Sequence, residues 1–146
     1  MTRRASGRGS GLIEFALLVL ILMLLALGVF NLGLAIEAGD TISAAARAGA
    51  FFGASDGNAN NTSGMQNAAL NSATGLTASM TANASTWCTC TAGSATTVSC
   101  TSLCNTYGPP IQYVKVQTSA TIPLLFNFPG VPLTIPLGAS FTLRAR

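Results

Sequence analysis

Apolar residues dominate one long stretch near the N-terminus. Residues 12–36 include only two clearly polar side chains, Glu14 and Asn31, and a run of about 20 apolar residues is enough to cross a bilayer. The chain then continues without a proline and is rich in alanine and leucine, which favour helix. We therefore predict one continuous helix over residues 10–54. At about 60 Å it is twice as long as a bilayer is thick, so only its first half can span the membrane.

The second half of this predicted helix has a different character. Glu37, Asp40 and Arg47 introduce charge, and small residues fill many of the remaining positions. Small side chains let another backbone approach closely. We expect this half to pack on the chain's own remaining residues, 55–146.

The rest of the chain predicts one short helix and a small sheet. Helical spacing is visible over Met65–Leu76, within a segment rich in Asn, Ser, Thr, Gly and Ala. Apolar and polar residues alternate over Ile111–Ile122, where β-branched residues are frequent, and again over residues 139–146. We predict that these two strands are antiparallel, with a further short strand near Thr96–Ser99.

Between the two alternating segments lies PLLFNFPGVPLTIPLG, residues 123–138, which has no charge and four prolines. Prolines at this density disfavour a regular helix or a central strand, so we predict an apolar excursion from the sheet. If exposed, it indicates contact with a partner or a membrane; alternatively, it folds back over the sheet. The fold class expected from all elements is α+β, a long transmembrane helix followed by a small antiparallel β head.

Charge is scarce and unevenly placed. Charged residues make up 8% of the chain, against about 25% in typical soluble domains. Arg3, Arg4 and Arg8 directly precede the apolar run, and by the positive-inside rule they predict a cytoplasmic N-terminus and a translocated head. Residues 1–9 have no apolar face and are interpreted as a leader. No basic stripe with interleaved aromatics accompanies these arginines, so no nucleic-acid partner is expected.

Four cysteines, Cys88, Cys90, Cys100 and Cys104, fall in one Thr/Ser-rich segment of the translocated part. That side is oxidising in a bacterium and favours disulfides. A zinc site is the alternative, but the C-x-C spacing is tighter than the usual structural-zinc pattern and the chain has no histidine. Of the three possible pairings, we favour those that join the first two cysteines to the last two; the sequence does not choose between them.

Catalytic chemistry is not indicated. The commonest general base and metal ligand, histidine, is missing, and the sequence contains neither a phosphate-binding glycine loop nor a nucleophile elbow. We therefore expect no enzyme, no metal and no cofactor.

A short motif explains why a carboxylate, Glu14, lies within the apolar run. Gly9 is followed by four residues, then Glu14, then the aromatic Phe15, and this order resembles the prepilin-peptidase site of type IV pilin-like proteins. The resemblance implies cleavage after Gly9, with Ser10 as the new N-terminus. Cleavage leaves four basic and four acidic side chains, and the new amino group can pair with the Glu14 carboxylate of a neighbouring subunit, offsetting the cost of burying either charge.

The resemblance extends along the helix. Residues 11–54 resemble the TadE-like family of minor pilins, or pseudopilins, of the tight-adherence (Flp-type) pilus system, with a signature similar to A-A-R-x-G-A at residues 45–50. The segment Tyr113–Arg146 is also similar to that family. Many relatives carry a proline about seven residues after the glutamate; here residues 20–22 are Leu, Ile and Leu, so no proline kink is expected.

Two functions follow from these features. The first is a structural minor pilin in pilus biogenesis and surface adherence. The resemblance implies as its partners a prepilin peptidase, other pilin-like subunits and an assembly platform in the bacterial inner membrane. The second is an uncleaved, single-pass membrane-anchored binding protein. A secretory signal removed by ordinary signal peptidase is disfavoured, because the apolar run exceeds the ~7–15 residues of a signal core.

Overall fold

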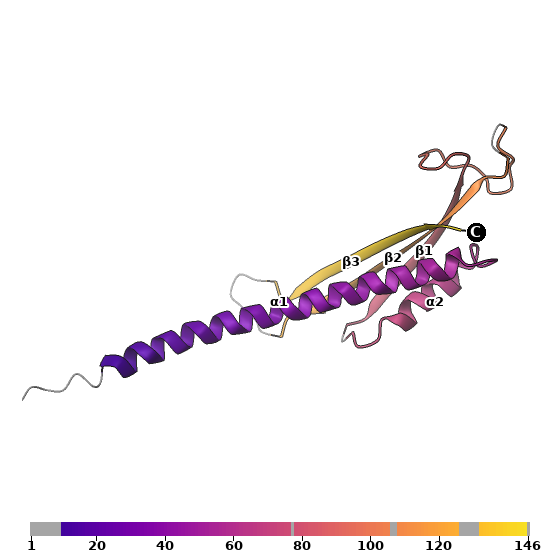
Figure 1. Cartoon of the computed structure of the whole chain (residues 1–146). Coiled ribbons are helices and arrows are strands. Elements are labelled where there is room, and N and C mark those ends of the chain that lie inside the picture. The colour runs from indigo at the N-terminus through magenta and orange to yellow at the C-terminus, as the bar shows by residue number, and fades with distance from the viewer. Residues whose placement is uncertain (1–9, 77, 106–107, 126–131, 146) are drawn as a thin grey trace, which may run out of the picture.

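The computed structural model describes residues 10–76, 78–105, 108–125 and 132–145. Its elements are two helices followed by three strands: α1 (Ser10–Ala54), α2 (Thr62–Ser72), β1 (Met80–Thr89), β2 (Ile111–Pro123) and β3 (Thr134–Arg144). The second half of α1 lies along the head, and the first half projects from it alone (Figure 1). The predicted α+β fold, a long apolar helix and a small antiparallel head, is confirmed.

The three strands form one antiparallel sheet in the order β1-β2-β3. Both helices pack against the sheet (Figure 1). The central strand supplies the core with every second residue, as its alternation predicted, because successive side chains of a strand point to opposite faces. The buried positions of β2 are Val114, Val116, Thr118, Ala120 and Ile122.

The second half of α1 buries one stripe of mostly small residues against this core. The stripe has the spacing of a single helix face and consists of Ile42, Ala45, Ala46, Gly49, Ala50 and Gly53. At Gly49 a Cβ atom would lie 2.7 Å from the backbone oxygen of Met65, so α2 packs on the backbone of α1 itself. The A-A-R-x-G-A signature therefore marks where α1 meets the head.

The third strand is not where the sequence placed it. The prediction near Thr96–Ser99 was wrong: Val98 there forms only an isolated bridge with Cys88, and the strand is β1. Its inward residues, such as Ala82 and Ala84, are half-buried but small. Alanine is depleted in strands, so the alternation of β1 was not recognised as a strand in the sequence.

Two other boundaries also differ. The apolar excursion predicted over residues 123–138 is shorter, because β3 already begins at Thr134 and includes Pro136. A proline is tolerated there because β3 is an edge strand. The predicted helix Met65–Leu76 ends earlier, at Ser72, and begins earlier, at Thr62. It begins there since the Asn61 side chain caps it by accepting a hydrogen bond from the Gly64 N–H at 2.9 Å.

Candidate functional site

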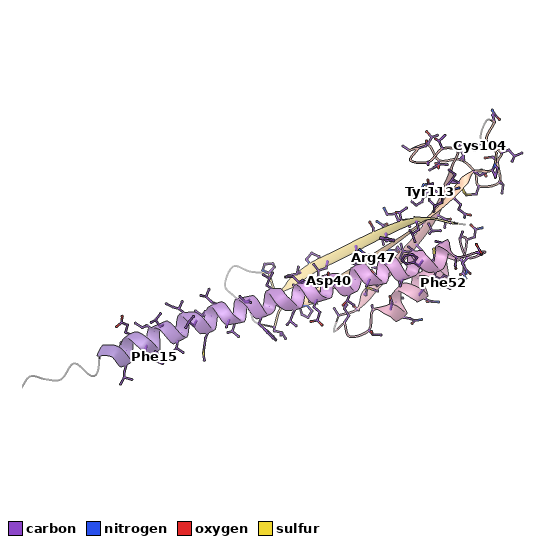
Figure 2. The ribbon with its side chains drawn as sticks, in the orientation of Figure 1. Phe15, Asp40, Arg47, Phe52, Cys104 and Tyr113 are labelled. Atoms are coloured by element: carbon purple, nitrogen blue, oxygen red, sulfur yellow. A yellow bond between two sulfur atoms is a disulfide. The ribbon has the colours of Figure 1, made fainter. Side chains whose placement is uncertain are left out.

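The first half of α1, residues 11–36, is the most unusual surface of the molecule; we call it the exposed half of α1. Leu12, Phe30 and Ile36 are 71%, 56% and 58% exposed. None of the most apolar part of this helix is buried, and its side chains project on all sides (Figure 2). A helix that is apolar all round has to be covered by lipid or by other helices, and this one is long and apolar enough to cross a membrane.

Three of the four predicted processing residues lie on the first turns of this helix. Ser10 is its first residue, Glu14 is exposed, and Phe15 is 66% exposed and points away from the rest of the chain (Figure 2). Ser10 and Glu14 are four residues apart, so they share one face of the helix. Gly9 lies outside the described residues, and its role stays a prediction.

Two carboxylates follow the exposed half of α1 at its head-side end. Glu37 and Asp40 are both exposed, and Asp40 lies where the helix has reached the head (Figure 2). Leu34 follows Glu14 by 20 residues, and that length of helix is about 30 Å, the thickness of a bilayer's hydrocarbon core. The spacing of the acidic residues thus suits a helix that crosses a membrane between Glu14 and Glu37.

Asn31 is the other polar residue of this half, and it behaves differently from its neighbours. Only 8% of Asn31 is exposed, whereas Phe30 and Leu32 are 56% and 61% exposed. Its Nδ2 has no hydrogen-bond partner among the residues that the structure describes. At helical spacing, Asn31 continues the buried stripe toward the N-terminus through the half-buried Leu34 and Ala38. The sequence identified Asn31 as polar but gave no signal that it faces the head.

A mostly apolar groove of about 500 Å³ lies at this level. Its wall combines residues of α1, of the turn after α2 and of the end of β2, including Leu34, Leu76, Ile122 and Leu125. Glu37 contributes the carboxylate at its rim. The groove therefore brings the end of β2 next to the point where α1 leaves the head.

The cysteines lie at the opposite end of the head. Cys88 is bonded to Cys100 and Cys90 to Cys104, which is one of the two arrangements that the sequence favoured. Figure 2 shows Cys104 at the far tip of the molecule, beyond Tyr113. The two bonds fasten the long β1–β2 connection to the end of the sheet and keep it away from the exposed half of α1.

The comparison with known families now bears directly on α1. Residues 9–50 match the family model described as TadE-like protein. This part of the chain is similar to TadE-like proteins. The match includes the glycine–glutamate motif, the whole exposed half of α1 and the A-A-R-x-G-A signature, so the resemblance predicted from these residues is confirmed.

The TadE-like match ends at residue 50, within the stripe that packs on the head. The similarity expected over Tyr113–Arg146 lies outside it and stays a prediction. No curated protein and no solved structure matches the chain. The chain thus combines a TadE-like match over residues 9–50 with a helix that is long and apolar enough to cross a membrane.

Proposed function

We propose that this protein is a structural minor pilin of a tight-adherence type IV pilus. It is inserted by α1 with residues 1–9 in the cytoplasm, cleaved after Gly9 by a prepilin peptidase, and then passed by the inner-membrane platform to other pilin-like subunits. The observation that carries the proposal is the exposed half of α1, whose large apolar side chains are open to solvent and which begins within the glycine–glutamate motif, in the part of the chain that matches the TadE-like model.

The same surface suits both stages of this pathway. In the membrane, lipid chains cover the exposed half of α1; after extraction, the corresponding helices of other subunits take the place of lipid. Either environment removes large apolar side chains such as Leu20 and Phe30 from water, at about 25 cal/mol per Å² of area covered. The head, which packs mainly on the second half of α1, stays outside in both stages.

Glu14 sets the position of one subunit against the next in this proposal. Cleavage creates a cationic amino group at Ser10, and a carboxylate among apolar helices is stable only if it is paired. Pairing between Ser10 of one subunit and Glu14 of another meets both needs. It also fixes how far one helix is displaced along its neighbour.

Intact-mass measurement and N-terminal sequencing of protein extracted from host membranes test the cleavage. We expect a chain that begins at Ser10. Replacing Gly9 by a bulky residue should leave Arg3, Arg4 and Arg8 attached. A wild-type chain that retains these arginines would instead support the anchored binding protein.

The assembly role of Glu14 requires a separate measurement. In Glu14→Ala we expect normal cleavage but loss of the subunit from sheared pili, because the amino group loses its partner. Glu37→Ala is the matched control, since Glu37 is exposed on the same helix but lies beyond its apolar segment. Equal incorporation of both variants would contradict the pairing.

A further inference from the structure

Exposed leucines lie at both ends of the connection between β2 and β3, next to the strands. Beyond the last strand pair, Pro123 with Thr134, the Leu124 N–H donates to the Leu133 oxygen at 2.9 Å, so the ladder continues for one more step. Leu125 and Leu133 are 62% and 60% exposed. We call residues 124–125 and 132–133 the hairpin end. It is a paired extension of the sheet with large apolar side chains outside the core.

Charge is kept away from the hairpin end. The sequence has no charged residue from 116 to 143. The flanking cations, Lys115 and Arg144, lie far along the two strands, where they pair with Thr142 and Tyr113. The hairpin end thus has no charged side chains, which are the costliest groups to transfer from water into an apolar phase.

The position of the hairpin end along α1 is set by the groove. Leu125 lines it together with Leu34 and Glu37, and Figure 1 shows β3 starting beside the middle of α1. With Glu14 at the inner boundary of the hydrocarbon core, Leu34 lies about 30 Å further along the helix, at the outer boundary. The leucines of the hairpin end are then level with the outer headgroups and the first part of the lipid chains.

Asn31 supports this depth independently. It lies one turn closer to the N-terminus than Leu34, which places it about 5 Å inside the hydrocarbon. Polar side chains at such depths face protein rather than lipid, and Asn31 does so, with 8% of it exposed. The head side of α1 is therefore covered at the very level where lipid would otherwise meet the amide.

From these observations we infer that the hairpin end is a second membrane contact, which seats Leu125 and Leu133 in the outer lipid boundary beside α1. The inference rests on the membrane anchoring of the proposed function. Lipid is the occupant because the hairpin end shares its depth with the end of the span. Two contacts hold the head at a fixed tilt and height, whereas α1 alone would leave it free to rotate about the helix axis.

Fluorescence quenching by brominated lipid tests the contact in the full chain. The only tryptophan, Trp87, is stacked on Tyr113 at the far end of the head, so Trp87→Phe gives a silent background. Leu125→Trp and Leu133→Trp then report on the hairpin end in two separate variants. Leu20→Trp reports on the span, and Thr142→Trp on an exposed position of β3 away from the hairpin end.

We expect both hairpin variants to lose most of their emission in vesicles brominated near the headgroup and less when the bromine is near the chain ends. Leu20→Trp should be quenched, and Thr142→Trp should not. Quenching at Leu20 alone overturns the second contact and leaves anchoring intact. A blue-shifted but unquenched hairpin signal means that protein covers it, which also overturns the inference. No quenching at Leu20 overturns the anchoring itself, and with it the second contact.

Discussion

The two halves of α1 belong to one uninterrupted helix, yet they meet different surroundings. In the exposed half, large side chains such as Leu12 and Phe30 point outward on every side. In the other half, small residues such as Ala45 and Ala50 are completely buried. The difference lies in size and arrangement rather than in helix-forming tendency, since leucine dominates the first half and alanine the second, and both favour helix. A stripe of small residues lets the head pack closely on the helix, whereas a surface of large apolar residues has to be covered by lipid or by other helices.

The largest effect should come from the contact that fills the docking stripe. Met65 is completely buried and packs on the two glycines of α1, Gly49 and Gly53. We expect Met65→Ala to lower the free energy of unfolding of the head by about 2–5 kcal/mol, as measured by urea denaturation of the full chain in detergent. Membrane insertion should not change. Adding Gly53→Ala should recover part of the loss, because its Cβ would occupy space that the Met65 side chain has left; a further loss would show that the two sites do not share this space.

A charged substitution in each half of α1 tests which half is inserted in the membrane. Leu22→Lys puts an ammonium group near the centre of the span, at an apparent cost of about 2.5–3.5 kcal/mol. Ala44→Lys puts the same group on the head half, at an exposed position. We expect the first variant to be extracted from membranes by alkaline carbonate and the second to remain. Retention of both would mean that the exposed half of α1 is not the span.

Adding a methyl group to a glycine distinguishes, on a smaller scale, the buried and the open faces of the second half of α1. Gly49→Ala forces a Cβ against the Met65 backbone oxygen at 2.7 Å, and such overpacking costs about 1–3 kcal/mol. Gly39→Ala meets nothing within 4 Å and should stabilise the helix by up to about 1 kcal/mol. Thermal unfolding followed by near-ultraviolet circular dichroism measures both. Opposite signs are expected, and equal shifts would argue against the tight α1–α2 packing.

The smallest effect concerns the cap of α2. Asn61→Ala removes the side chain that accepts from the Gly64 N–H, and losing such a cap costs about 1 kcal/mol. Asn67→Ala, an exposed change on the same helix, should leave stability within about 0.5 kcal/mol of wild type. A urea titration resolves the pair. If Asn67→Ala were as damaging, the loss would have to be assigned to something other than the cap.

The sequence predicted those features that depend on contrast between neighbouring residues. The long helix, the alternation of β2 and the division of α1 all differ in hydropathy from what adjoins them, and all are confirmed. The strand β1 was missed because its inward residues Ala82 and Ala84 are small and are not among the residues that favour strands, although polar residues alternate with them. The start of β3 was missed because Pro136 is excluded from a central strand but allowed at an edge, and edge position is a property of the whole sheet.

The candidate site was predictable to a similar degree. Glu14 was identified because a carboxylate is conspicuous in an apolar run. The burial of Asn31 and the tight contact at Gly49 depend on which side of the helix the head occupies. That side is fixed by contacts between α1 and the sheet, such as the hydrogen bond from the Thr118 hydroxyl to the Ile42 oxygen, 76 residues apart in sequence, so no local pattern contains it.

The absence of a proline within α1 has a geometric consequence. In a straight helix, the number of residues between two positions fixes the angle between them around the axis as well as their distance along it. From Glu14 to Ile42 the helix makes about 7.8 turns at about 3.6 residues per turn, so Glu14 points about 80° away from the side on which the sheet lies. A neighbouring subunit that binds Glu14 would therefore also set the rotational orientation of the head about the axis of α1. Inserting one residue between the two would swing the head by about 100° without disturbing a contact in either half.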